Sequence, residues 1–308
     1  MKIASLFTAL INIDSELYQF EIEKGFYLTS ADAVKKTVIK NTLPAIGGLE
    51  FQSIIDNKIL AFAYIKDNIT DETKYNKLHD FLFSMDNYIT ALWLIKDNSI
   101  YKELGYLSYD NNTKFFSNFI AQINSEHTGK KKVTSYSIEE LKSAIPYYRK
   151  INILMVNDNE FEFTEFTPES NRLSRALYFI NGARLIPDIG VKYTLFCTSL
   201  ESLLTTETNN IKRSLAERVE MILKDLIPNV KSYIYKSYEY RSQIIHGNTF
   251  KESELKKQNK LISNLSFLDE ICRLVIRAIM DNPELEKVFK KNDNDIDKYF
   301  KKAVSNRV

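Results

Sequence analysis

The second half of the chain carries one repeating pattern of apolar residues. Apolar side chains return every three or four positions, which places them on a single face of a helix. The pattern predicts helices over residues 171–185, 189–204, 211–226, 230–246 and 252–280, then a short helix near Pro283 and another over 296–304. Pro187 and Pro228 follow the first and third of these segments and cannot continue a helix. We therefore expect an all-α helical bundle over residues 166–308.

The first half of the chain mixes two periods. Alternating polar and apolar residues over 18–23, with a turn at Gly25, predict a half-buried strand. A short predicted helix opens with Ser137 and Glu140 in capping-box register. Hairpins are predicted over residues 54–65 and 104–116. Helices are predicted over residues 71–95 and 137–148, and a segment of strand and loop over residues 151–166. The expected fold class is therefore an α+β N-terminal domain over residues 1–165, followed by the helical bundle.

The composition is that of an ordinary folded chain without a membrane span. Of 308 residues, 44% are hydrophobic and 27% are charged, and no apolar run reaches the ~18 to 20 residues that cross a bilayer. The apolar N-terminus is interrupted by Ser5, Thr8 and Asn12, so we interpret it as a first strand or helix rather than a signal peptide. Cys197 and Cys272 lie on predicted apolar helix faces, which indicates buried free thiols and a reducing cytoplasm.

Charge divides unevenly between the two halves. Residues 171–308 hold 24 Lys and Arg against 17 Asp and Glu, whereas residues 1–170 hold 18 against 23. The balances of +7 and −5 are consistent with a polyanionic partner for the second half, although an ordinary solvated helix surface has the same character. The sequence carries no zinc-binding, phosphate-loop or serine-hydrolase motif, so we expect neither a metal nor another cofactor.

One segment combines two side chains with complementary chemistry. Residues 238–247 read YEYRSQIIHG, with Arg241 and His246 five positions apart at the end of the predicted helix over 230–246. Gly247 suits the left-handed C′ position that ends a helix. An arginine holds a phosphate through a planar fork of donors, and a histidine moves a proton near neutral pH. The segment predicts metal-free cleavage of RNA, with Arg241 and His246 as the catalytic residues.

Helix geometry sets a condition on this pair. Five positions separate the two side chains by about 140° around an ideal helix, so they do not share a face. We therefore expect His246 to lie at a frayed helix end next to Gly247. Pairing of the motifs of two protomers would also bring an arginine and a histidine together.

Residues 171–281 resemble a HEPN domain of the Apea-like kind found in abortive phage-infection proteins. The resemblance rests on LYF over 177–179, FCTSLESLL over 196–204 and YEYRSQIIHG over 238–247, the last fitting the family's R-x(4–6)-H signature. It implies a helical bundle, commonly a homodimer, whose two Arg–His motifs face each other across the interface. It also implies metal-independent cleavage of tRNA or mRNA in antiviral defence or a toxin-like stress response.

The resemblance extends to supporting residues. Glu201 is similar to the polar residue that many family members place beside the motif, and it is expected to orient Arg241. Ser242 or Tyr238 would position phosphate or water, with packing as the alternative role for both. His246 has its own alternative, a contact with the last carbonyls of its helix.

Other interpretations remain open at the level of the whole chain. Arg241 could form a structural ion pair with Glu201 or Glu239, and the chain could be a catalytically silent HEPN module that binds RNA or dimerises as a scaffold or regulator. Residues 1–165 carry no resemblance, and we expect a sensor or partner-binding domain that meets a phage-derived or protein trigger. The remaining histidines, His79 and His127, are interpreted as incidental.

Overall fold

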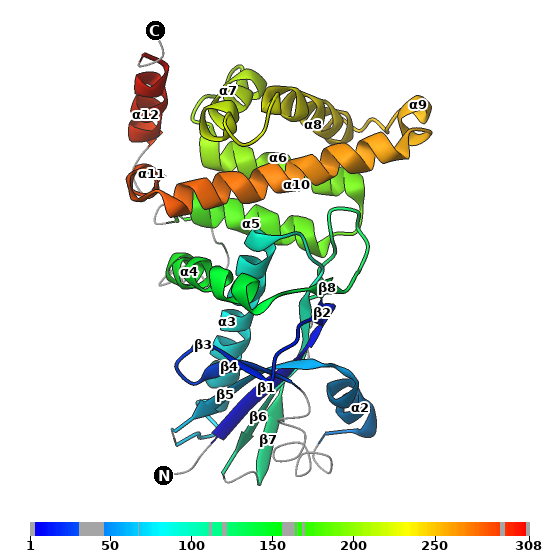
Figure 1. Ribbon diagram of the computed structural model, residues 1–308, viewed down its shortest axis with the longest axis vertical. Coiled ribbons are helices and arrows are strands. Elements are labelled where there is room, and N and C mark those ends of the chain that lie inside the picture. The colour runs from blue at the N-terminus through cyan, green and yellow to red at the C-terminus, as the bar shows by residue number, and fades with distance from the viewer. Residues whose placement is uncertain are drawn as a thin grey trace. The chain divides into compact units, whose positions relative to one another are not determined.

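The chain forms two compact units, shown in a computed structural model (Figure 1). The structure describes residues 4–30, 46–66, 68–110, 113–118, 122–155, 164, 166–167, 170–289 and 293–305. The N-terminal unit comprises residues 1–92, 98–124 and 131–148, and the helical unit comprises residues 93–97, 125–130 and 149–308. The units therefore interleave along the chain. The sequence predicts one division between residues 165 and 166 and gives no sign of this interleaving.

The N-terminal unit is built on an antiparallel sheet of six strands in the order β3-β4-β5-β1-β6-β7. The strands are β1 (Ala4–Ile11), β3 (Gln19–Glu23), β4 (Phe26–Ser30), β5 (Ile59–Ile65), β6 (Tyr101–Tyr109) and β7 (Lys114–Ser117). Two short strands, β2 (Ile13–Asp14) and β8 (Thr134–Ser135), pair in parallel beside it. The predicted turn at Gly25 is confirmed, because this residue joins β3 to β4 with a φ of +83°.

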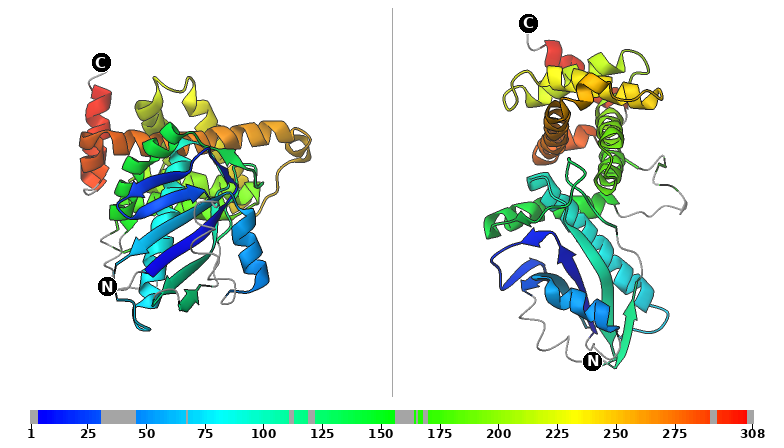
Figure 2. Two further views of the ribbon diagram at one scale, coloured as in Figure 1. Left: turned by 60° about the horizontal axis from the view of Figure 1, so that its bottom comes forward. Right: turned by 90° about the vertical axis from the view of Figure 1, so that its right-hand side faces the viewer.

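Helices α2 (Gly48–Asp56) and α3 (Lys74–Ile95) pack on opposite faces of the sheet (Figure 2). Phe7 of β1 and Ile54 of α2 belong to one buried cluster. On the other face, a Cβ at Gly105 would lie 2.6 Å from Leu82 Cδ2 of α3. Glycine is therefore required there for the helix to approach the strand.

Two predictions for the first half of the chain are wrong in part. Residues 54–56 belong to α2 and not to a hairpin, because Ile54 packs on the sheet at helical spacing from Phe51. Helix α4 (Ile138–Met155) continues beyond residue 148, so residues 151–155 are helical; most of 156–166 lies outside the described residues. The predicted capping box is confirmed: Ser137 N–H donates to Glu140 Oε2 over 2.9 Å, and Glu140 N–H donates to Ser137 Oγ over 3.2 Å.

The helical unit confirms the prediction of helices throughout the second half. They are α5 (Arg172–Leu185), α6 (Ile189–Leu204), α7 (Ile211–Leu223), α8 (Val230–Ile245), α9 (Glu252–Leu255), α10 (Gln258–Asp281), α11 (Pro283–Phe289) and α12 (Asp293–Ser305). Helix α6 packs against α5, α8 and α10, and its Tyr193, Phe196 and Leu200 are buried. The single helix predicted over 252–280 is wrong, because the chain breaks at residues 256–257 into α9 and α10.

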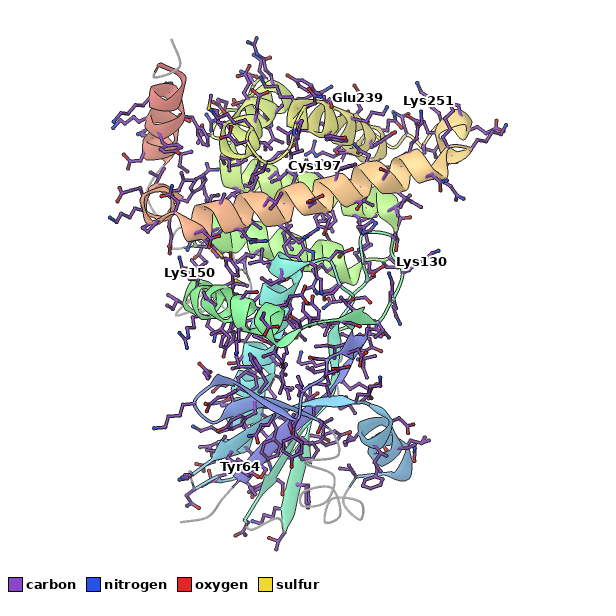
Figure 3. The ribbon with its side chains drawn as sticks, viewed as in Figure 1. Tyr64, Lys130, Lys150, Cys197, Glu239 and Lys251 are labelled. Atoms are coloured by element: carbon purple, nitrogen blue, oxygen red, sulfur yellow. The ribbon has the colours of Figure 1, made fainter. Side chains whose placement is uncertain are left out.

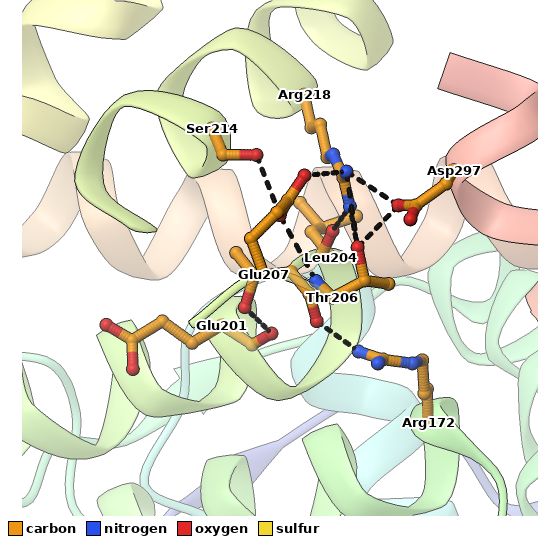
Figure 4. A network of polar contacts seen from close by, with 9 residues as sticks. Arg172, Glu201, Leu204, Thr206, Glu207, Ser214, Arg218 and Asp297 are labelled. Atoms are coloured by element: carbon orange, nitrogen blue, oxygen red, sulfur yellow. Dashed lines mark hydrogen bonds and ion pairs between the residues drawn. The ribbon is translucent and has the colours of Figure 1, made fainter. Parts of the chain in front are cut away.

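A buried arginine fastens α12 to the rest of the helical unit (Figure 4). Arg218 of α7 donates to the Leu204 carbonyl over 2.5 Å, to Glu207 Oε1 over 2.5 Å and to Asp297 Oδ1 over 2.8 Å. The Thr206 hydroxyl also bonds Asp297. These contacts link the end of α6, the loop that follows it, the middle of α7 and the final helix.

Candidate active site

Helix α8 ends at the residue that the sequence predicts. Gly247 has a φ of +75° and occupies the left-handed C′ position. Its N–H donates to the Ile244 carbonyl over 3.1 Å, and the Asn248 N–H donates to the Gln243 carbonyl over 2.8 Å. These two bonds form a Schellman motif, which satisfies the terminal carbonyls. The expected frayed end is therefore wrong: the last turn before Gly247 is closed and hydrogen-bonded.

Three of the predicted site residues come together between α6 and α8. Arg241 Nη2 donates to Glu201 Oε2 over 3.1 Å, and the Arg241 guanidinium lies 5.1 Å from the centre of the Tyr238 ring. The two charged side chains are largely buried, with exposed fractions of 19% for Arg241 and 15% for Glu201. The orienting contact expected of Glu201 is present, and so is the structural ion pair.

The second partner considered for Arg241 is engaged elsewhere. Glu239 lies on the exposed side of α8 and pairs with Lys212 over 3.4 Å and with Lys236 over 3.3 Å (Figure 3). Glu201 is therefore the carboxylate that holds Arg241 in place.

Burial governs the electrostatics of this cluster. It raises the pKa of Glu201, while the Arg241 charge and the Tyr238 hydroxyl act to lower it. Burial also raises the pKa of Tyr238 and of the Cys197 thiol, which lies one helical turn before Glu201. Cys197 and Cys272 are both buried and free, as the sequence predicts.

One donor of Arg241 has no partner. Its Nε is buried and makes no hydrogen bond to any described residue, and Gln243 Oε1 on the same helix is in the same situation. A buried donor without a partner costs about 1–3 kcal/mol, and such groups in folded proteins call for an explanation. The contact with Glu201 thus anchors one end of the Arg241 guanidinium and uses only part of its hydrogen-bonding capacity.

His246 is exposed at the C-cap position of α8 and does not join this cluster. Its backbone N–H donates to the Ser242 carbonyl over 3.1 Å. The imidazole of His246 and the hydroxyl of Ser242 make no side-chain hydrogen bond or ion pair with the described residues. Within one protomer, the structure brings Arg241, Glu201 and Tyr238 together and leaves His246 apart from them.

A pocket that the sequence did not indicate adjoins Glu201. It is lined by residues of α5 and α6, namely Arg172, Arg175, Phe179, Thr198, Glu201, Ser202 and Thr205. Arg172 Nη1 donates to the carbonyls of Ser202 and Thr205, over 2.8 and 2.6 Å, and so holds the C-terminal end of α6. The spacing of Arg172 and Arg175, three positions apart in the first turns of α5, was the only signal in the sequence.

A second polar cluster lies in the core of the helical unit and involves His127, which the sequence analysis treats as incidental. His127 Nδ1 lies 2.7 Å from Asp97 Oδ2, and the His127 backbone N–H donates to the same oxygen over 3.0 Å. Asp269 of α10 accepts from Trp93 Nε1 and from Arg273 Nε, each over 2.9 Å. Because these partners lie far apart in sequence, local patterns could not reveal the cluster.

The described ranges hold no group of three or more metal-ligating side chains. Within the same ranges, none of the helices combines the length and the apolar character of a transmembrane span.

Comparisons of this chain with protein-family models, with curated proteins and with solved structures found no match. The functional reading therefore depends on the residues and on their geometry.

Proposed function

We propose that this chain is a metal-independent endoribonuclease of HEPN type that works as a homodimer in the cytoplasm, in anti-phage defence or a toxin-like stress response. One observation carries the proposal. A largely buried arginine is held by Glu201, keeps an unpaired Nε, and precedes by five residues an exposed histidine at an ordered helix end.

The chemistry follows from the two side chains. The 2′-oxygen of the substrate attacks the adjacent phosphorus, the bond from phosphorus to the 5′-oxygen breaks, and a 2′,3′-cyclic phosphate and a 5′-hydroxyl end form. His246 accepts the proton of the 2′-hydroxyl or supplies one to the leaving 5′-oxygen. Arg241 stabilises the charge that develops on the phosphorane oxygens, and Glu201 with Tyr238 fixes its guanidinium.

The closed end of α8 supports an active site that is completed by a second protomer. Because the last turn is regular, Arg241 and His246 remain on different sides of the helix. Ile245 beside His246 is an exposed large apolar residue, at 50%, which suits a contact between two copies. In such a dimer, His246 of one protomer acts on the phosphate held by Arg241 of the other.

The decisive experiment is a cleavage assay on total tRNA and mRNA in the presence of EDTA. It compares the unmodified protein with His246→Ala and Arg241→Ala, and uses His79→Ala, an exposed histidine of the N-terminal unit, as matched control. We expect cleavage with 2′,3′-cyclic phosphate ends, a loss of ~100-fold or more in both site variants, and no loss in the control. Circular dichroism checks that each variant is folded. Cleavage that His246→Ala leaves unchanged would exclude the proposed mechanism.

One observation favours a second candidate, a silent HEPN module that binds RNA or dimerises. Arg241 already has a carboxylate partner, and the imidazole of His246 is not aligned with it in the single chain. If the unmodified protein binds RNA or forms dimers without cleaving, and His246→Ala retains both properties, this candidate replaces the enzyme. The N-terminal unit would then serve as the regulator or sensor, as it would for a nuclease that awaits a trigger.

A further inference from the structure

The pocket between α5 and α6 shares a side chain with the Arg–His site. Glu201 lines this pocket and also accepts the hydrogen bond from Arg241. A ligand in the pocket is therefore separated from Arg241 by a single carboxylate. The pocket has a volume of about 360 Å³, near the lower end of the range for sites that bind small ligands. This volume suits one nucleotide rather than a duplex.

The charge of the pocket suits an anion. Two arginines, Arg172 and Arg175, line it together with one carboxylate, Glu201, whose charge is offset by Arg241. Arg172 is fixed in place by the two carbonyls at the end of α6. Arg175 lies one helical turn further along α5 on the same lining, where its guanidinium adds a second positive charge. A phosphate group is the anion that such arginines recognise most readily.

One aromatic side chain lines the pocket and packs against two others outside the lining. Phe179 lines it, and its ring lies 5.4 Å from the ring of Phe166 and 6.0 Å from that of Tyr178. Phe166 and Tyr178 are each 45% exposed, and the centres of their rings lie 5.2 Å apart. Exposed aromatic rings beside arginines are what proteins use to bind unpaired nucleic acid, because bases stack on the rings while the arginines hold the backbone. An apolar protein partner would not need the arginines.

We propose that this pocket binds one unpaired nucleotide of an RNA substrate, with its base against the aromatic rings and its phosphate at Arg175. The proposal rests on the proposed ribonuclease function and deepens it. The bound nucleotide would place the neighbouring part of the strand next to Arg241, so that the pocket positions the substrate without taking part in the chemistry.

The test is a binding titration in the full-length His246→Ala background, in which the RNA stays intact. The probe is a fluorescently labelled, unstructured 12-nucleotide RNA followed by anisotropy. Arg175→Gln and Tyr178→Leu are compared with Arg213→Gln, an exposed arginine of α7 that pairs with Glu217. We expect Arg175→Gln and Tyr178→Leu, the latter at a ring that packs on the lining residue Phe179, each to weaken binding by roughly 5- to 100-fold. The salt dependence should lose about one phosphate contact for Arg175→Gln, and binding should change by less than ~2-fold for Arg213→Gln.

Two outcomes separate this inference from the function it depends on. If the unmodified protein cleaves RNA and both pocket variants bind like their parent, the pocket proposal is wrong and the ribonuclease proposal stands. If the unmodified protein neither cleaves nor binds RNA, the function fails and the pocket proposal fails with it. A 12-base-pair RNA duplex that competes as well as the single strand would also overturn the assignment of an unpaired nucleotide.

Discussion

Two of the arginine–carboxylate pairs in the helical unit, Arg273 with Asp269 and Arg241 with Glu201, differ in how completely their atoms are used. Asp269 is 1% exposed, and both of its oxygens accept hydrogen bonds, from Trp93 and from Arg273. Glu201 and Arg241 share one bond of 3.1 Å at a less buried place, and Arg241 Nε has no partner. The difference teaches that both oxygens of the Asp269 carboxylate serve the fold, whereas the Arg241 pair is less buried and leaves part of its hydrogen-bonding capacity unused.

Asp269 also interacts electrostatically with the neighbouring Asp97. Burial and the charge of Asp97 raise the pKa of Asp269 to about 6, against the opposing effect of Arg273. Burial alone would raise the pKa of Asp97 as well, but the hydrogen bonds from His127 bring it below its ordinary value. This cluster is therefore a balanced set of charges, in which removal of one member leaves the others uncompensated.

Replacing the buried carboxylate should have the largest effect. Asp269→Ala removes the acceptor of both Trp93 and Arg273, and we expect the free energy of unfolding to fall by ~3–5 kcal/mol. Urea denaturation followed by circular dichroism measures it. A loss below ~1 kcal/mol would mean that the cluster does not stabilise the unit, and the contrast between the two pairs would disappear.

The loop that brings His127 to this cluster depends on Gly129. Gly129 has a φ of +75°, and a Cβ there would lie 1.9 Å from the Pro187 carbonyl oxygen. We expect Gly129→Ala to cost ~2–3 kcal/mol, from backbone strain together with displacement of the loop. Gly48→Ala is the matched control, since a Cβ at Gly48 meets nothing within 4 Å. Equal unfolding midpoints in urea for the two variants would contradict the described docking.

The Arg241 pair should separate stability from activity. Glu201→Ala is expected to lower the free energy of unfolding by about 1–2 kcal/mol, because it removes one charge-assisted hydrogen bond. On the proposed function it should also reduce RNA cleavage by ~10-fold or more, since Arg241 loses its anchor. The two measurements are urea denaturation and the EDTA cleavage assay. Destabilisation as large as that of Asp269→Ala would erase the distinction between the pairs.

The pH dependence of stability reports on His127. Burial alone would lower the pKa of His127, but Asp97 raises it, with Asp269 and Glu126 contributing. Protonated His127 therefore contributes its full stabilisation below the pKa of histidine in the unfolded chain, about 6.5. This contribution is lost as the pH rises through the higher pKa of His127 in the folded state. The pKa of Asp97 is lowered in the folded state, so ionised Asp97 stabilises the fold above the pKa of an unfolded aspartate, about 3.9. This stabilisation is lost as the pH falls through the lower folded pKa.

The pair should thus stabilise the unit most between about pH 4 and 6.5. His127→Gln is expected to cost about 1–2 kcal/mol at pH 6 and clearly less at pH 9, measured by urea denaturation at both values. A cost that is the same at both pH values would show that charge plays no part in the His127–Asp97 contact.

The smallest effect is expected at the end of α8. In Gly247→Ala the new methyl group meets no atom within 4 Å, so only the φ of +75° opposes the substitution. We expect the free energy of unfolding to fall by about 1 kcal/mol or less. Thermal unfolding measures this cost. A loss of RNA cleavage much larger than the loss of stability would show that the Schellman end positions His246.

Local signals account for what the sequence predicted well. The bounds of α6 follow from its apolar face, and Asp188 caps its start by accepting from the Val191 N–H. The end of α8 follows from Gly247. The break at residues 256–257 between α9 and α10 contains no glycine or proline. The apolar periodicity therefore predicted one continuous helix across it.

Contacts between distant residues account for most of what was missed. His127 and Asp97 lie 30 positions apart, and nothing in either segment marks the pair. Arg241 and Glu201 lie 40 positions apart, and their contact was anticipated through the resemblance to a family together with the opposite charges. The pocket beside Glu201 depends on how α5 lies along α6, which periodicity alone does not determine.

The interleaving of the two units has a consequence for the order in which the molecule is made. Residues 93–97 and 125–130 leave the ribosome well before α10, which supplies Asp269 and Arg273 to the cluster they share. The helical unit therefore cannot complete this part of its core until α10 has been translated. If the proposed ribonuclease function holds, a nascent chain that has not yet made α10 would carry a nuclease with an incomplete core, and the messenger RNA and tRNAs in use would be spared.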